Sequence, residues 1–461
     1  MKALRDPDCL LSEGLAAIRA QFKVPPGFPP DVLEAAEAAA QRVPSDHADR
    51  TAVPFVTLDP ASSTDLDQAF AIEQAGADLL LRYAIADVAW FVSDGDALDR
   101  EAWARGETTY LPDGKAGLYP PALAERAASL LADGPRPAVI FTTRVAPDGA
   151  VKLEGVERAV IRSRAKLGYE EVRDDQLPAG FVDLADRIAA AEDRRGAARV
   201  DPPEQEVERD AAGHFTLRFR PLAPAERRNA ALSLATNMAV ADALLAAGTG
   251  LFRVMASPDP QSVARLRHTA RAFGLDWPRQ ASLEQFEKTL DPANPADGAF
   301  MLAIRRAGNG ASYEPWQDGV TPWHAAMAAT YCHMTAPLRR LADRYVVRAA
   351  LAVANGLAVP TEVAEAFQRL GPVMDKAGAR SAQVERAVID LAETAILHGQ
   401  EGKSFAAVVI DLGESGTRIQ LCDLPVVART TARSVTPGER ITVRLDRADP
   451  IRRELGFSRI A

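Results

Sequence analysis

Three aspartates within nine positions are the first candidates for chemistry in this sequence. Asp59, Asp65 and Asp67 lie in the stretch FVTLDPASSTDLDQAF, residues 55–70, and Gln68 follows them directly. Asp59 should end an extended run, and Asp65 and Asp67 alternate along the next one, which places both side chains on one face. Converging carboxylates suit Mg²⁺ or Mn²⁺, and two such ions about 4 Å apart can hold a phosphate and activate a water. The alternative is an ordinary acidic loop whose side chains accept hydrogen bonds from backbone amides.

A basic segment, YCHMTAPLRRLADRYVVR at residues 331–348, is the second candidate. Its proline can begin a helix, on which arginines at four-residue spacings from Arg340 onward would share one face. Arg339 would point elsewhere, near the start of that helix. A guanidinium matches the oxygens of a phosphate and stabilises the charge that develops during phosphoryl transfer. The alternative is a solvated basic face that Asp343 balances.

The histidines and cysteines do not form a metal-binding pattern. His324 and His333 lie nine residues apart without a second pair, so we expect hydrogen-bonded core residues or substrate contacts there rather than metal ligands. The cysteines, Cys9, Cys332 and Cys422, are far apart in the sequence. They predict neither a disulfide framework nor a zinc ribbon.

The composition is typical of a soluble protein with several domains. The chain has 461 residues, of which 47% are hydrophobic and 25% charged, and a domain usually takes about 100–200 residues. Its net charge is -9, so any binding of nucleic acid must use local basic patches. Neither a secretory signal nor an apolar run of about 18 residues is present. We therefore expect a cytoplasmic protein without a membrane span.

The hydrophobic pattern changes its period along the chain. Residues 10–21 and 31–42 predict two leader helices, whereas residues 50–167 are mostly β-branched runs separated by hairpin turns. Helical periodicity dominates from residue 180, and the last helical stretch should bend or break near Gly371-Pro372. Five short strands between residues 403 and 461 then indicate a small OB-like barrel.

Eight segments of the sequence occur in an informative order. They are FVTLDPASSTDLDQAF, YAIADVAWFV, TTYLPD, RSRAKLGYEEV, RRGAARVDPPEQEV, LFRV, PWHAAMAATYCHMTAPLRRLADRYVVR and ARSAQVERAVIDL. In this order they resemble the catalytic domain of the ribonuclease II/R (RNB) family of exoribonucleases, over about residues 50–395. The resemblance implies an α+β fold, in which helices surround the β-sheet core of an RNB catalytic domain. A C-terminal OB-fold β-barrel that binds RNA and a short helical N-terminal leader complete it. We place the leader at residues 1–47, the RNB domain at 48–398 and the OB-fold domain at 399–461.

The resemblance also implies roles for the acidic cluster. By matching positions, Asp59, Asp65 and Asp67 correspond to metal-binding aspartates of the family, and Asp67 to the one most critical for catalysis. The family run is usually DxDD, and Gln68 replaces its last aspartate. A glutamine offers a carbonyl oxygen without a charge, so we expect Gln68 to be a weaker fourth ligand. Mg²⁺ is the expected cofactor, and Mn²⁺ is the alternative.

Further residues are expected to contact RNA. Arg339 matches the catalytic arginine that contacts phosphate in the family, Tyr110 a tyrosine that stacks on the terminal base, and Glu385 a glutamate near the terminal nucleotide. Arg340 and His333 join them as candidate substrate contacts near the basic segment.

The function that the resemblance implies is processive, hydrolytic degradation of single-stranded RNA from its 3′ end to nucleoside 5′-monophosphates. It implies no membrane and no protein partner. The alternative is a non-catalytic RNA-binding or regulatory protein with a decayed site. Gln68 favours decay, as do the about 47 residues of the leader, too few for the cold-shock modules of bacterial members. The retained aspartates, Tyr110 and Arg339 argue against it. The OB-like barrel argues against a third function, a phosphatase or nuclease for small substrates.

Overall fold

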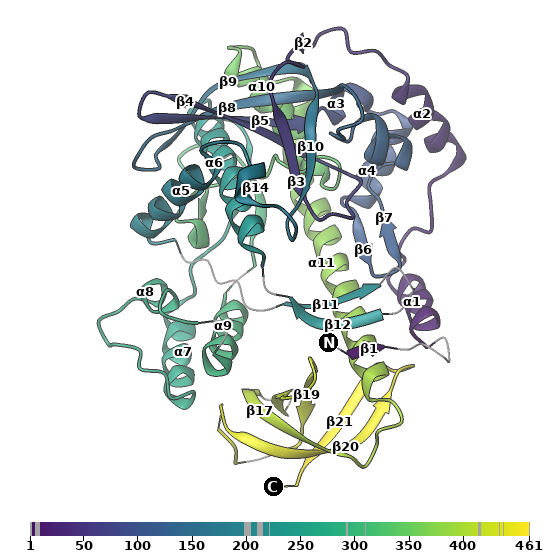
Figure 1. Cartoon of the computed structure of the whole chain (residues 1–461), viewed down its shortest axis with the longest axis vertical. Coiled ribbons are helices and arrows are strands. Elements are labelled where there is room, and N and C mark those ends of the chain that lie inside the picture. The colour runs from purple at the N-terminus through teal and green to yellow at the C-terminus, as the bar shows by residue number, and fades with distance from the viewer. Residues whose placement is uncertain are drawn as a thin grey trace.

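A seven-stranded mixed sheet forms the core of the region predicted to be the RNB domain in the computed structural model (Figure 1). In spatial order its strands are β10 (Ser163–Gly168), β3 (Phe55–Asp59), β4 (Gln68–Ala75), β5 (Asp78–Ala86), β8 (Arg136–Val145), β9 (Val151–Ile161) and β2 (Ala48–Asp49). The pairs β10–β3 and β2–β9 are parallel, and the other neighbours are antiparallel. The structure describes residues 2–4, 10–197, 204–209, 215–220, 222–291, 294–308, 310–413, 416–432, 434–436 and 438–460.

The hairpin of β4 and β5 fixes the register next to the acidic cluster. Its pairs run from Gln68 opposite Ile85 to Ala75 opposite Asp78, and Gly76 adopts a φ of 65° in the turn, a value that glycine tolerates without strain. Buried apolar side chains along both strands hold this register, because a shift by one residue would turn them to the other face. The first residue of β4 therefore has a fixed position directly after Asp67.

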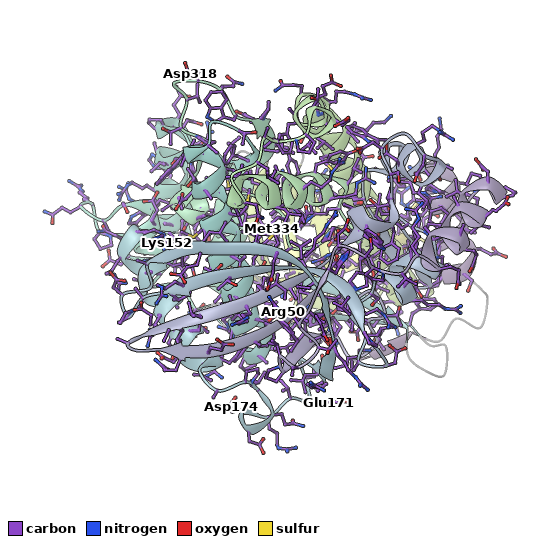
Figure 2. All side chains as sticks on the ribbon, turned by 90° about the horizontal axis from the view of Figure 1, so that it is seen from above. Arg50, Lys152, Glu171, Asp174, Asp318 and Met334 are labelled. Atoms are coloured by element: carbon purple, nitrogen blue, oxygen red, sulfur yellow. The ribbon has the colours of Figure 1, made fainter. Side chains whose placement is uncertain are left out.

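Helices cover the sheet and its ends. They are α2 (Pro30–Ala40), α3 (Val88–Phe91), α4 (Ala97–Arg105), α5 (Phe181–Arg195), α6 (Pro224–Ala246) and α10 (Leu341–Ala354). In length and composition α6 could cross a membrane, but most of it is buried inside the protein, as in a core helix. Figure 2 views the sheet and its helices from above, with Glu171 and Asp174, which follow β10, at the rim of the molecule.

The longest helix is α11 (Thr361–Leu397), and it is continuous. Of the predicted bend or break near Gly371-Pro372, the break is therefore wrong, because packing along the helix outweighs the hydrogen bond that a proline removes. A glycine is needed at position 371 for a separate reason, the close approach of another strand. A Cβ there would lie 2.9 Å from the carbonyl oxygen of Tyr313, in strand β14 (Ser312–Pro315).

A closed five-stranded barrel follows α11, as predicted for the C-terminal region. Its strands are β17 (Ser404–Gly413), β18 (Gly416–Leu421), β19 (Val427–Thr430), β20 (Arg440–Asp449) and β21 (Glu454–Arg459). The barrel core is continuous with the end of α11 and with leader helix α1 (Leu10–Gln21) in one hydrophobic cluster. Both predicted leader helices are thus present, and α1 packs closely enough on α11 that a Cβ at Gly14 would meet Leu391 at 2.6 Å.

Short strand pairs and helices lie between these parts. The short antiparallel strand pairs are β6 (Thr109–Leu111) with β7 (Gly114–Ala116), β11 (Glu204–Arg209) with β12 (Phe215–Arg220), β13 (Leu251–Val254) with β14, and β15 (Trp323–His324) with β16 (Ala329–Thr330); β1 (Lys2–Leu4) also pairs with β12. The short helices are η1 (Leu123–Ala127), η2 (Asp174–Gln176), α7 (Pro260–Ala272), α8 (Leu283–Glu287), α9 (Pro295–Ala307) and η3 (Ala325–Met327).

Candidate active site

The acidic loop between β3 and β4 is held in place by two hydrogen bonds with Ser129. The Ser129 hydroxyl accepts a hydrogen bond from the Leu66 amide at 2.9 Å and donates one to the Thr64 carbonyl oxygen at 2.7 Å. Leu66 is fully buried in the core. Since neighbouring side chains of an extended segment point in opposite directions, Asp65 and Asp67 face away from that core, as the spacing predicted.

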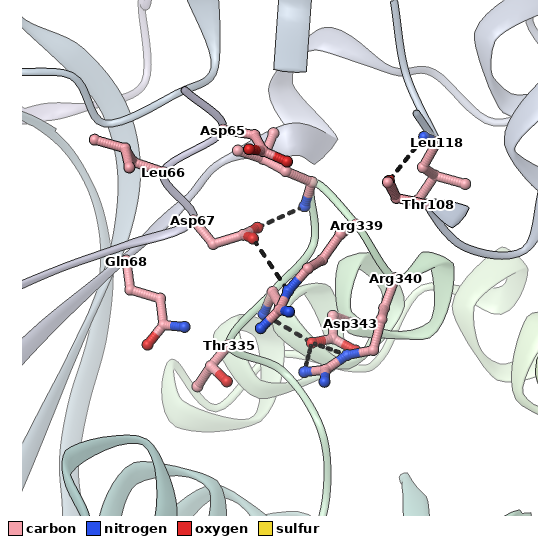
Figure 3. A network of polar contacts seen from close by, with 12 residues as sticks. Asp65, Leu66, Asp67, Gln68, Thr108, Leu118, Thr335, Arg339, Arg340 and Asp343 are labelled. Atoms are coloured by element: carbon pink, nitrogen blue, oxygen red, sulfur yellow. Dashed lines mark hydrogen bonds and ion pairs between the residues drawn. The ribbon is translucent and has the colours of Figure 1, made fainter. Parts of the chain in front are cut away.

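Asp67 is the most constrained carboxylate of the cluster. Its Oδ1 accepts a hydrogen bond from the Leu338 amide at 2.7 Å, and its Oδ2 lies 3.7 Å from Nε of Arg339 (Figure 3). Burial raises the pKa of Asp67 to about 8, although the Arg339 guanidinium and the Leu338 amide favour the charged form. Arg339 alone therefore does not compensate this buried carboxylate.

Asp59, at the end of β3, also lacks compensation. Its Oδ2 is buried and has no hydrogen-bond partner among the described residues. Burial raises the pKa of Asp59 to about 6, against the attraction of Arg339, and the nearby Asp65 adds to the rise. Asp59 and Asp67 both interact with Arg339 and Asp65, and a divalent cation bound at these carboxylates would supply the missing positive charge, so their chemistry fits a hard metal ion.

Asp65 is turned toward the β6–β7 hairpin. Its Oδ1 lies 2.8 Å from Nζ of Lys115, and its Oδ2 accepts a hydrogen bond of 3.4 Å from the Tyr110 hydroxyl. Lys115 also lies 3.1 Å from Oε1 of Glu125. Lys115 was not among the predicted site residues, although a hairpin over Tyr110-Leu111-Pro112-Asp113-Gly114-Lys115 would have placed it opposite Tyr110, as the register shows.

The Gln68 side chain forms a hydrogen bond with a residue of the sheet. Its carboxamide oxygen accepts a short hydrogen bond from the hydroxyl of Tyr83, which is fully buried. Figure 3 shows the Gln68 and Asp67 side chains leaving the chain in different directions. Among the described residues, no group of three or more His, Cys, Asp or Glu side chains is arranged to hold a metal ion. The four predicted ligands, Asp59, Asp65, Asp67 and Gln68, thus remain a prediction.

The basic segment differs from its prediction in two respects. The helix α10 begins at Leu341, not at the proline, because Asp343 accepts the amide of Ala336 at 2.8 Å and holds the preceding residues in a loop. The expected basic face is also wrong. Arg344 is 1% exposed and pairs with Asp99, and Arg348 binds Asp94 at 2.6 Å.

The loop before α10 separates the two neighbouring arginines. Arg339 keeps 45% of its side chain exposed, and its carbonyl oxygen accepts the amide of Thr108 at 3.0 Å. Arg340 forms an ion pair of 2.7 Å with Asp343. His333 lies 2.8 Å from the Tyr313 hydroxyl through Nδ1, and burial holds its pKa well below the usual range. In this structure Arg340 and His333 make protein contacts, and their proposed contacts to RNA remain predictions.

A cavity of about 530 Å³ lies beside this loop. It brings four predicted site residues together: Tyr110, Arg339, Arg340 and Glu385. Gln205, Glu206 and Val207 of β11 also line this cavity.

A second cavity, of about 690 Å³, lies between α11 and the barrel. It shares Gln205, Glu385 and Ile389 with the first cavity, so the two meet along α11. Six arginines line the second cavity: Arg305, Arg386, Arg418, Arg429, Arg447 and Arg453. They come from α9, α11 and the barrel, so no local sequence pattern could have grouped them.

Comparison with known proteins matches both folded regions. The sequence profile of the RNB domain matches residues 48–355, and that of the RNase II-type exonuclease C-terminal S1 domain matches residues 403–460. Ribonuclease R of Aquifex aeolicus is 27% identical over 435 residues, which cover 87% of this chain and 60% of the relative. The chain spans about 60% of the length of the curated relatives that it matches first.

Solved structures share the fold at low sequence identity. Mycoplasma genitalium RNase R in complex with ribose-methylated single-stranded RNA has a TM-score of 0.85 and 21% identity, covering 100% of this chain and 79% of that one. Yeast Ssd1, a pseudonuclease, has a TM-score of 0.72 and 16% identity, covering 96% of this chain and 57% of that one. Because the fold is common to a nuclease and a pseudonuclease, the residues of the site must distinguish the two functions.

Proposed function

Because the chain belongs to the RNB domain family, we propose that it is a metal-dependent 3′-to-5′ exoribonuclease that hydrolyses single-stranded RNA to nucleoside 5′-monophosphates. The observation that carries this proposal is the position of Arg339 between the buried Asp67 and the cavity beside Tyr110. A phosphate in that cavity would meet the Arg339 guanidinium, which also lies beside the Asp67 carboxylate. This is the arrangement that hydrolysis of a phosphodiester requires.

Each residue of the site has a separate task in this reaction. The half-exposed Tyr110 offers its ring to the terminal base, and stacking on an aromatic ring contributes about 1–3 kcal/mol per base. Arg339 contacts the phosphate and stabilises the negative charge that develops on its oxygens. Asp59 and Asp67 would hold Mg²⁺, which when bound lowers the pKa of a water and polarises the phosphate. Leu338 orients Asp67 through its amide.

The arginine-lined cavity supports a route for the RNA strand. Arginines bind the phosphates of RNA whatever its nucleotide sequence. The arginine-lined cavity meets the cavity beside Tyr110 at Gln205, Glu385 and Ile389. A single strand could therefore contact the barrel and reach Arg339 along α11. The net charge of -9 is compatible with RNA binding because these cations are concentrated in one place.

A non-catalytic RNA-binding protein is the second candidate, since yeast Ssd1 shares the fold. Two features favour catalysis. The Leu338 amide holds Asp67 in the orientation that faces Arg339, and Asp59 keeps a buried oxygen without a partner among the described residues. A site that only binds RNA has no use for either arrangement, and the unpartnered Asp59 oxygen destabilises the protein without a cation.

End-labelled oligo(A) with Mg²⁺ tests the proposal directly. The expected result is a stepwise shortening from the 3′ end with release of 5′-AMP, which stops when EDTA is added. Binding without shortening, at every Mg²⁺ and Mn²⁺ concentration tried, would favour the second candidate. Cys332 and Cys422 are both free, which is compatible with a reducing compartment, and we infer a cytoplasmic location on that basis.

A further inference from the structure

The Lys115 ammonium lies beside the acidic cluster but has no role in the proposed reaction. Lys115 lies on β7 directly opposite Tyr110. Its Nζ is 2.8 Å from Oδ1 of Asp65 and 3.1 Å from Oε1 of Glu125, and 23% of its side chain is exposed. A lysine between two carboxylates, next to the residue that would stack on the base, provides a fixed positive charge at the edge of the acidic cluster.

The three aspartates differ in the positive charge already available to them. Both oxygens of Asp65 are occupied, one by Lys115 and the other by the Tyr110 hydroxyl. Asp59 Oδ2 has no hydrogen-bond partner among the described residues, and Asp67 Oδ2 is 3.7 Å from Arg339, beyond hydrogen-bonding distance. An ion entering the site therefore gains more from Asp59 and Asp67, whereas binding to Asp65 Oδ1 must first displace an ammonium.

The hairpin that carries Lys115 is itself held in place. Asp113, in its turn, accepts a hydrogen bond of 2.8 Å from Arg19 of the leader helix α1. The Leu118 amide, just after the hairpin, donates to the Thr108 hydroxyl at 3.0 Å (Figure 3). Thr108 in turn contacts the Arg339 carbonyl oxygen through its amide. These hydrogen bonds therefore fix the position of Lys115 relative to the loop that carries Arg339.

We propose that Lys115 is a positioning residue that holds Asp65 out of the metal site. The site then binds one divalent ion, at Asp59 and Asp67, and the Lys115 ammonium takes the place of a second ion on the Tyr110 side. This inference rests on the proposed function only in that the site takes a metal ion. It differs from the expectation of three aspartate ligands, because Asp65 acts through its ion pair.

The number of bound Mn²⁺ ions, measured by electron paramagnetic resonance of the free ion, tests this without RNA. Wild-type protein should bind one Mn²⁺ per chain. Lys115→Met releases Asp65 and should allow a second ion, whereas Lys115→Arg keeps the charge and should bind one. Lys152→Met is the matched control, since Lys152 lies on the exposed surface of β9 (Figure 2). Two ions in the wild type, or the same stoichiometry in Lys115→Met, would overturn the inference.

A second pair of variants keeps the test decisive if Lys115→Met does not fold. Asp59→Asn should weaken Mn²⁺ binding at least tenfold, whereas Asp65→Asn should change it less than twofold. Equal losses in both variants would show that Asp65 is a ligand and would refute the role of Lys115. Failure of the proposed function looks different: oligo(A) would stay intact although Mn²⁺ binds with the expected stoichiometry.

Discussion

The amide of Leu338 donates a hydrogen bond of 2.7 Å to Asp67 Oδ1 across 271 residues of sequence. This bond joins the loop after β3 to the loop before α10, and it holds Asp67 beside Arg339, which lines the cavity near Tyr110. Neither loop alone contains a catalytic arrangement. The sheet fixes the first loop and α10 the second, so the site depends on the relative position of these two elements.

Asp67→Asn should abolish turnover and leave folding and RNA binding nearly unchanged. The asparagine carbonyl can still accept the Leu338 amide, but the side chain no longer carries the charge that a metal ion requires. Since burial raises the pKa of Asp67 to about 8, a neutral side chain should not lower the melting temperature. The measurements are oligo(A) shortening, RNA binding in EDTA and thermal unfolding.

Asp94→Asn is the matched control, because Asp94 also pairs with an arginine but lies away from the cavity residues. It should retain wild-type turnover. If Asp67→Asn shortens oligo(A) at a comparable rate, the acidic cluster is not the catalytic centre.

Arg339→Lys should reduce the rate of hydrolysis strongly. A lysine keeps the charge but loses the planar fork that matches two phosphate oxygens, a loss of roughly 2–4 kcal/mol of transition-state stabilisation. That corresponds to a rate about 30- to 1000-fold lower under single-turnover conditions. Arg348→Lys, which alters a surface ion pair with Asp94, should stay within about twofold. Equal rates for Arg339→Lys and wild type would assign Arg339 a purely structural role.

Glu393 should make the stability of the protein depend on pH. It joins α11 to β19 and β11, because its Oε1 accepts the Val427 amide at 2.7 Å and the Gln205 side chain at 2.6 Å. Burial raises the pKa of Glu393 from 4.5 to about 8, so the folded protein retains a proton that the unfolded chain releases. Its contribution is fully present below pH 4.5 and is lost as the pH rises to about 8.

Glu393→Gln tests this because the amide oxygen can accept both hydrogen bonds at every pH. The free energy of unfolding of the wild type, relative to this variant, should fall between pH 5 and pH 8 and stay constant above that. Parallel pH curves for the two proteins would show that Glu393 does not titrate in this range.

Local pattern was sufficient for the parts of the site that lie within one segment. The period of two placed Asp65 and Asp67 on one side of the extended chain, and the five short strands predicted the barrel. The four-residue spacing already separated Arg339 from Arg340, but the role of Arg339 could be assigned only through the resemblance. The structure separates them by a long-range contact, the Asp343 carboxylate that binds Arg340 and the Ala336 amide.

The features that the sequence did not reveal all depend on contacts between distant segments. Lys115 reaches Asp65 across 50 residues, because the β6–β7 hairpin folds over the acidic loop. Helix α10 begins at Leu341, and not at the proline as predicted, because Asp343 stabilises the loop before it. The continuity of α11 through Pro372 is likewise decided by its packing. Propensity describes the isolated chain, and these outcomes are set by burial and charge in the folded protein.

Gln68→Asp should lower the Mg²⁺ concentration for half-maximal rate on oligo(A). A carboxylate next to Asp67 adds about 1 kcal/mol or more of attraction for a cation a few ångströms away, even in a water-like dielectric, which corresponds to about fivefold or more in affinity. Aspartate is one methylene shorter than glutamine, so the hydrogen bond from Tyr83 should lengthen, and thermal unfolding checks that the fold is kept. Tyr83→Phe is the companion variant, because it releases the Gln68 carbonyl oxygen without adding charge. If residue 68 is a metal ligand, Tyr83→Phe should also lower the Mg²⁺ concentration for half-maximal rate. If residue 68 affects the metal only through the added charge, Gln68→Asp alone should lower that concentration. Coincident curves for all three proteins at fixed ionic strength would place residue 68 outside the reach of the metal, and would leave Asp59 and Asp67 with the phosphate as its partners.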